Sequence, residues 1–433
     1  MHPYETGASH RMTPTNTKSR GAETASVGDV LDSFYNVRTC VLDLFEASDL
    51  DPTKTRELAR DLGLNRGLAW RLSRIVRADD SASVAHDVPG KSSLLRFAAR
   101  CIELGADQSL IDQLIESVDH YEASIAACTG SRKTLAMLLA NQTEKATQQD
   151  RERARRTLFE GACSVWGVQA QTRFVTVFLL PSKEDPDMVD AAHVTGYIGF
   201  RRLGERPWPM SYEAVHDAEG NAVHIKKTPL DPRGYEEGQL QLLPDFCEPR
   251  EPEIEVEVNG DYKCFNLAAG PVGNLGMTDC VFGSYLTNIY PRYTPIESAH
   301  LETAGFMVLL QAPVERVLFD YFVHKDIESV GEPVTHLLDR LTYPHINREE
   351  FFDRQSIHID ETHRSIAQTA KGAYTPHISW YSKLLTFVTD RIQEPLDAFE
   401  GTRFEMNYPP ISTTLSRRIT LARNPDDPAK INR

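Results

Sequence analysis

The spacing of apolar residues changes character about 170 residues into the chain. Between residues 29 and 163 apolar residues recur every three or four positions, which predicts helices because that spacing places them on one face. Expected helices begin near Val30, cover about 92–104 and 107–128, and continue over about 131–163. From residue 172 onward, short runs rich in β-branched and aromatic residues predict strands. We expect these strands at 173–180, 193–200, 212–216, 221–226, 253–258, 262–267, 306–310, 317–323 and 411–421.

Helices are also expected in the C-terminal part, at about 333–341, 348–352 and 376–396. The sequence Asp217-Ala218-Glu219-Gly220 predicts a hairpin turn between the strands on either side of it. Because strands come in clusters without alternating helices, this part is expected to be α+β with a mainly antiparallel sheet.

Residues 51–77 predict two short helices joined by a tight turn. Asp51-Pro52 is a suitable start for the first helix, since an Asp cap followed by Pro suits the unpaired N–H groups there. Gly63 supplies the permissive backbone of the turn. Asn65 can cap the second helix, which is expected to run from Arg66 to about Arg77.

The second helix separates apolar from basic residues. At roughly 100° per residue, one side collects Leu68, Ala69, Leu72, Ile75 and Val76. The opposite side collects Arg66, Trp70, Arg74 and Arg77, flanked by Arg71. Guanidinium groups suit phosphates and guanine edges, so this side is a candidate DNA-binding surface.

At this point the chain resembles the helix-turn-helix of bacterial transcriptional regulators, and the likeness is closest to the IclR group. It covers about residues 29–80 and rests on Leu58, Ala59, Leu62, Gly63, Leu64, Ala69 and Leu72, with Val41, Leu42 and Leu44 of a preceding helix. The chain departs from the pattern at Gly67-Leu68, where those regulators usually have small hydroxyl residues, and no clear wing hairpin follows. Helix pairs of this spacing also occur as plain packing modules in larger helical domains.

The resemblance implies a DNA-binding transcriptional regulator whose partner is double-stranded DNA. Asn65, Arg66, Trp70, Arg71, Arg74 and Arg77 would contact DNA, and the basic cluster Arg151–Arg156 would add phosphate contacts or form a solvated helix face. Such regulators usually bind as homodimers, because two half-sites about 34 Å apart multiply affinity. A small-molecule effector would then act by favouring one arrangement of the two heads.

The full domain plan is multidomain. It comprises a disordered tail (1–27), a helix-turn-helix domain (28–80), a helical domain with linker helices (81–165), an α+β sensing or assembly domain (170–423) and a tail (424–433). A length of 433 residues fits this plan, since one core rarely grows past about 250–300 residues.

Bulk composition adds three expectations. A hydrophobic content of 41% and a charged content of 25% are those of a globular protein, and no apolar run reaches the roughly 20 residues needed to span a bilayer. The seven cysteines show no CxxC pairs, which favours reduced thiols and a cytoplasmic location. The net charge of −15 belongs mostly to residues 157–433, with 26 Lys+Arg against 40 Asp+Glu, whereas residues 1–156 hold 21 against 22.

Other candidate chemistry is weaker, and neither a cofactor nor a metal is expected. His358, Asp360, Glu361 and His363 are the best metal candidates, with His345 and His377 nearby, but a five-residue spacing does not align the first and last on a helix. The loop Gly270–Gly276 lacks the Lys-Ser/Thr of a P-loop. Cys163, Cys264 and Cys280 lack a nucleophile signature, and Trp166, Trp208, Trp380 and the Tyr285–Tyr293 cluster suit either a core or a ligand pocket.

The rival interpretation is an enzyme of unknown class, or a self-assembling structural protein, whose helical region serves only for docking.

Overall fold

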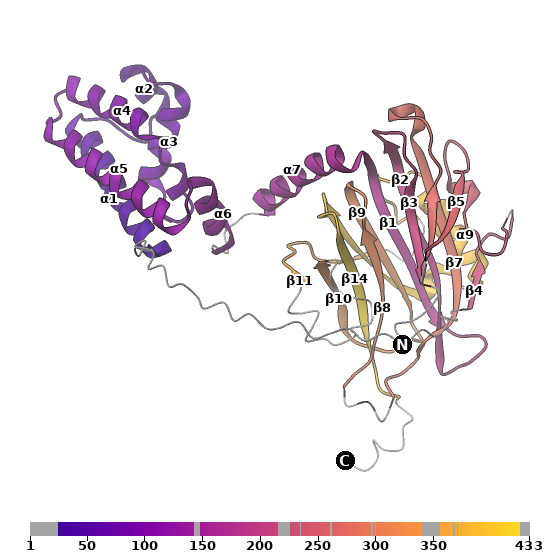
Figure 1. Ribbon diagram of the computed structural model, residues 1–433. Coiled ribbons are helices and arrows are strands. Elements are labelled where there is room, and N and C mark those ends of the chain that lie inside the picture. The colour runs from indigo at the N-terminus through magenta and orange to yellow at the C-terminus, as the bar shows by residue number, and fades with distance from the viewer. Residues whose placement is uncertain are drawn as a thin grey trace, which may run out of the picture. The chain divides into compact units, whose positions relative to one another are not determined.

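A computed structural model describes residues 25–142, 148–214, 226–233, 235–259, 262–295, 298, 300–339, 356–366, 369 and 371–424. The chain divides between Thr147 and Gln148 into two units, shown in Figure 1. Most of the N-terminal tail that was expected to be disordered, residues 1–24, lies outside the described residues, as does most of the expected C-terminal tail.

The N-terminal unit is helical. Its α-helices are α1 (Val27–Ala47), α2 (Thr55–Asp61), α3 (Arg66–Arg77), α4 (Lys91–Glu103), α5 (Ser109–Cys128) and α6 (Arg132–Gln142), with a short 3₁₀ helix, η1 (Ala85–Asp87). At the start of α1, the Ser26 side chain accepts a hydrogen bond from the Asp29 N–H while the Asp29 carboxylate accepts from the Ser26 N–H. This capping box satisfies two of the donors that a helix leaves free at its start.

One continuous hydrophobic core joins all six helices, from Val30 in α1 to Leu139 in α6. The helix pair at 55–77 therefore shares its core with residues 81–142 instead of closing one of its own. This sharing adds buried apolar surface to a segment of about 50 residues, which by itself would be only marginally stable.

Helix α7 (Gln148–Trp166) belongs to the C-terminal unit, although its sequence continues the helical pattern of the first unit. It packs on strands β1, β9 and β13. The boundary between the units thus lies before α7, about 20 residues earlier than the boundary expected near residue 165.

The described strands of the C-terminal unit form three sheets. A seven-stranded sheet has the order β12-β13-β9-β1-β2-β7-β4, a four-stranded sheet the order β11-β10-β14-β8, and a three-stranded sheet the order β3-β6-β5. Only β1 and β9 pair in parallel among these strands, and every other pair is antiparallel. The strands are β1 (Val168–Pro181), β2 (Met188–Arg202), β3 (Trp208–Ala214), β4 (Lys226–Pro229), β5 (Ile254–Asn259), β6 (Tyr262–Leu267), β7 (Thr278–Pro291), β8 (Thr303–Leu310), β9 (Val314–His324), β10 (Ser329–Asp339), β11 (Ser356–Ile357), β12 (Arg364–Ile366), β13 (Phe399–Asn407) and β14 (Thr413–Leu421).

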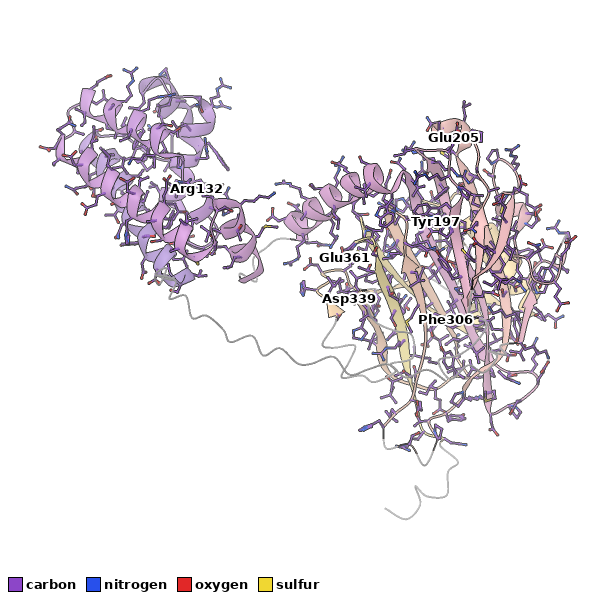
Figure 2. All side chains as sticks on the ribbon, viewed as in Figure 1. Arg132, Tyr197, Glu205, Phe306, Asp339 and Glu361 are labelled. Carbon is purple, nitrogen blue, oxygen red and sulfur yellow. The ribbon has the colours of Figure 1, made fainter. Side chains whose placement is uncertain are left out.

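The two larger sheets pack face to face, and helix α9 (Tyr381–Ile392) covers the outer face of the seven-stranded sheet. Alternate residues of β1 serve the two layers: Val175 and Val177 lie between the sheets, whereas Phe174 and Phe178 lie under α9. Figure 2 labels Phe306 on β8, which packs against the core of this sandwich, and Tyr197 on β2, which lies in another core shared with the three-stranded sheet. Because successive side chains of a strand point to opposite faces, the seven-stranded sheet contributes to one core between the sheets and to another under α9.

The expected fold class is confirmed in its coarse form: a helical N-terminal region precedes a C-terminal region with a mixed, mostly antiparallel sheet. One local prediction is wrong: residues 333–339 lie in strand β10 instead of a helix. The hairpin turn expected at 217–220 lies outside the described residues. The helix expected at 348–352 lies outside the described residues. Among the helices that are described, none is long and apolar enough to cross a bilayer.

Candidate nucleic-acid interface

The turn between α2 and α3 is built from residues suited to it. Gly63 has φ +61°, which only glycine adopts without strain, and Leu64 is buried behind it. The Asn65 side-chain oxygen accepts a hydrogen bond of 2.8 Å from the Leu68 N–H, so the predicted cap of the second helix is confirmed. The predicted start of the first helix is wrong: α2 begins at Thr55, and Asp51 instead accepts a hydrogen bond from the Thr53 N–H in a preceding turn.

Helix α3 is held by its apolar side. Its buried residues are Leu68, Ala69, Leu72, Ser73, Ile75 and Val76, and each predicted apolar position is among them. Arg38 of α1 donates a hydrogen bond of 2.8 Å to the Val76 carbonyl, which fixes the end of the helix. The opposite side is consequently held towards solvent.

That solvent side carries four arginines and no acidic residue. Arg66 and Arg77 are exposed, Arg71 is half-buried, and Trp70 has 51% of its surface exposed. Among the residues that the structure describes, Arg66, Arg71 and Arg77 form no ion pair. Their guanidinium groups are therefore available to an anionic partner.

Arg74 differs from the other three arginines. Its Nη1 atom lies 2.7 Å from the Asp87 carboxylate, and its guanidinium stands 5.2 Å from the Trp70 ring centre. A groove of about 630 Å³, lined by Trp70, Arg74, Arg77, Asp79 and Asp80 among others, follows the C-terminal half of α3. Asp79, Asp80 and Asp87 thus lie near the C-terminal half of α3.

Two arginines of the basic cluster at Arg151–Arg156 form ion pairs within the C-terminal unit. Arg151 pairs with Asp360, and Arg155 pairs with Glu361 while its Nε donates to the Asn407 carbonyl at 3.2 Å. The Arg155 and Glu361 side chains are only 10% and 9% exposed. These pairs fasten α7 to the segment around Glu361, which Figure 2 labels. Two of the four arginines are therefore unavailable to DNA.

The side chains considered as metal ligands have other partners. Asp360 and Glu361 are occupied by arginines, His358 Nε2 lies 3.1 Å from Asp360, and His363 Nε2 lies 3.3 Å from Glu332. His345 lies outside the described residues. Over the described part of the chain, no three His, Cys, Asp or Glu side chains are grouped so that they could hold a metal ion.

The three cysteines considered as nucleophiles, Cys163, Cys264 and Cys280, are held as neutral thiols. Burial raises the pKa of Cys163 to about 11, and it raises the pKa of Cys280 well above the usual thiol value. Burial likewise raises the pKa of Cys264. These thiols stay protonated at neutral pH, where only the thiolate would react.

Comparison of the chain with known proteins identifies no relative. No family model, curated protein or solved structure matches the chain.

Two carboxylates escaped the sequence analysis. Glu248 and Asp279 line a cavity of about 480 Å³ on the C-terminal unit, together with Trp380. These residues come from three segments spread over more than 130 residues, so no local spacing could have indicated them. Of the aromatic candidates named from the sequence, Trp380 lines this cavity, whereas Trp166 and Trp208 pack edge to face at 6.5 Å.

Proposed function

We propose that this protein is a DNA-binding transcriptional regulator whose N-terminal unit is a helix-turn-helix module and whose C-terminal unit senses a ligand or mediates assembly. The observation that carries the proposal is helix α3, with one side buried, four arginines on the rest of its surface and no acidic residue. A cationic helix held out from a packed unit suits the negative phosphates of DNA.

The N-terminal half of α3 would read the bases. In helix-turn-helix proteins the recognition helix places its N-terminal residues against base edges in the major groove. Arg66 is the first residue of α3, and Arg71 follows little more than one turn later. Each guanidinium can donate two parallel hydrogen bonds to a guanine. Trp70, exposed between them, would contact sugar or a thymine methyl group.

The other site residues take supporting roles. Asn65 uses its side-chain oxygen as the helix cap, which leaves only its amide N–H groups for DNA. Arg77 would contact phosphate at the end of the helix. Arg74 would have to exchange Asp87 for phosphate, so its contribution to affinity is expected to be smaller than that of Arg66.

Two differences from winged helix-turn-helix domains limit the ways in which this protein could contact DNA. Residues 78–142 contain helices and no strand, so a hairpin wing does not follow α3 in this described stretch. Gly67 and Leu68 leave the first turn of α3 without hydroxyl groups for phosphate contacts. Recognition would consequently depend on arginine contacts made by α3 alone in each subunit, which favours a homodimer on two half-sites.

The uneven distribution of charge along the chain also favours DNA contact through the N-terminal unit. Residues 157–433 carry 26 basic against 40 acidic residues, and such a unit would be repelled by DNA. The N-terminal unit would therefore approach the duplex first.

Selection of DNA fragments tests the proposal. The purified full-length chain is incubated with sheared genomic DNA at low salt, and the retained fragments are sequenced beside the input. We expect enrichment of fragments that share a repeated half-site, and no enrichment by the variant Arg66→Ala/Arg71→Ala. Retention of fragments in the same proportions as the input by both proteins would contradict a role in sequence recognition.

A further inference from the structure

The cavity that contains Asp279 lies beside the end of the seven-stranded sheet. It has a volume of about 480 Å³, within the range of small-molecule sites. Its walls come from β1, β2, β7, the loop 270–276 and the segment before α9. None of its lining residues is a lysine or an arginine, whereas two, Glu248 and Asp279, are carboxylates.

Asp279 is fixed in position but has no cationic partner. Its Oδ1 accepts a hydrogen bond of 2.7 Å from the Gly199 N–H, and the Trp380 side chain also bonds to its carboxyl group. Burial raises the pKa of Asp279, and the charge of Glu248 raises it further. Neither Asp279 nor Glu248 forms an ion pair with any described residue. A carboxylate withdrawn from water without a counter-charge is stabilised by a cation.

An aromatic face stands beside this carboxylate. The Trp380 ring is half-buried and held by Phe174 at 5.9 Å and by Phe246 at 5.2 Å between ring centres. A fixed indole ring attracts an ammonium group through its negative face and also packs against apolar groups. The carboxylate and the ring therefore favour the same kind of ligand.

The loop at 270–276 provides an apolar rim. Gly276 cannot carry a side chain, because a Cβ atom there would lie 1.8 Å from the Pro271 carbonyl oxygen. The tight loop leaves Leu275 92% exposed next to the cavity, with Met277 40% exposed beside it. A ligand that covers Leu275 would remove its exposed apolar surface from water, which is favourable. The absence of lysine and arginine from the cavity also separates this glycine-rich loop from a phosphate cradle.

His377 contributes no positive charge to the cavity. Burial, together with the charge of Arg316, lowers the pKa of His377. Arg316 itself is engaged by Glu405 at 2.9 Å. Asp279 and Glu248 thus determine the sign of the charge on the lining.

We propose that this cavity binds a small organic cation, an ammonium group attached to an apolar or aromatic body. The ammonium would lie between Asp279 and Glu248, and the body would lie against Trp380 and Leu275. In the regulator proposed above, such an amine would be the effector. This last step rests on the proposed function, but binding itself does not.

Calorimetric titration of the full-length chain, without DNA, tests the site. The probes are phenethylammonium, its neutral analogue 2-phenylethanol and the anion 3-phenylpropionate. We expect phenethylammonium to bind at least 10-fold more tightly than either of the others. Equal affinity for the cation and the neutral analogue, or no binding of the cation at millimolar concentration, would overturn the proposal.

Variants locate the binding. Asp279→Asn should weaken phenethylammonium binding at least 10-fold, and Glu248→Gln, at an exposed side chain, should weaken it several-fold even if the first variant unfolds. Asp397→Asn removes an exposed carboxylate outside the cavity and should bind as the wild type does. Unchanged affinity in a folded Asp279→Asn protein would overturn the assignment. Because DNA is absent, these results are independent of the fragment selection.

Discussion

Replacement of Asp320 by asparagine should destabilise the C-terminal unit more than any exposed substitution. Asp320 and Arg403 are 0% and 1% exposed, and they face each other across β9 and β13. Arg403 Nε donates to Asp320 Oδ1 at 2.7 Å and Nη2 donates to Oδ2 at 2.6 Å. The Tyr381 hydroxyl donates to Oδ2 at 2.5 Å. The carboxylate thus accepts three hydrogen bonds and neutralises a buried cation.

The expected loss of stability follows from the hydrogen bonds that Arg403 and Tyr381 can still form after the substitution. Asparagine offers one acceptor oxygen where the carboxylate has two, so a donor of Arg403 or Tyr381 must face an amide N–H group. The Arg403 guanidinium keeps its bonds to the Ala373 and Tyr374 carbonyls but loses its counter-charge. Breaking a buried pair in this way costs about 3–5 kcal/mol. For a unit of this size the melting temperature should fall by roughly 10 °C.

Urea unfolding followed by tryptophan fluorescence measures the loss, because three of the four tryptophans, Trp166, Trp208 and Trp380, lie in the C-terminal unit. Asp326→Asn, at a side chain that is 67% exposed, is the matched control and should change stability by no more than about 0.5 kcal/mol. A loss below about 1 kcal/mol for Asp320→Asn would refute the reasoning. It would mean that water or another group compensates Arg403 in solution.

Three further predictions concern the helices and one histidine. Asn65→Ala should destabilise the N-terminal unit by about 1 kcal/mol in thermal unfolding, because the cap of α3 is lost, whereas Asn65→Asp should retain it. Arg151→Ala/Arg155→Ala should lower the melting temperature of the C-terminal unit yet leave DNA affinity within about twofold of wild type, since structural pairs and not phosphate contacts are removed; a tenfold loss of affinity would count against this assignment. Burial and the nearby cations Arg173 and Lys227 lower the pKa of His193 to about 3, so between pH 6.5 and 3 the unfolded chain binds a proton that the folded chain does not. Stability should therefore fall as pH decreases through that range, and His193→Gln should reduce the loss between pH 6.5 and 4.5 by roughly 1–2 kcal/mol in urea unfolding; identical pH profiles would contradict it.

The helix pair could be predicted from sequence because its determinants are local. The cap at Asn65, the left-handed turn at Gly63 and the apolar face of α3 all lie within a few residues of the groups that they affect. Strand β1 was predictable for a similar reason. It is buried on both faces, so nearly every residue of its central run is apolar.

Strands whose burial depends on distant partners could not be predicted in this way. The inward positions of β13 include Gly401 and Arg403, which a search for apolar residues does not detect. Arg403 is buried only because Asp320 lies opposite. β10 has a helix-like spacing of apolar residues, but its pairing with β14 imposes an extended backbone. The cavity at Asp279 has the same origin, since Trp380 reaches it from about 100 residues away along the chain.

The salt dependence of DNA binding tests the central claim most directly. On a fragment enriched by selection, fluorescence anisotropy gives the affinity of wild type, of Arg66→Ala/Arg71→Ala and of the matched control Arg96→Ala/Arg100→Ala on α4. Each phosphate contact contributes about 0.9 to the slope of log affinity against log salt. If both α3 arginines contact phosphate or adjacent bases, their removal should weaken binding at least tenfold and lower the slope by up to about 1.8, whereas the control variant keeps both values. Equal affinities and slopes for all three proteins would show that α3 does not contact DNA, and the regulator proposal would then fail.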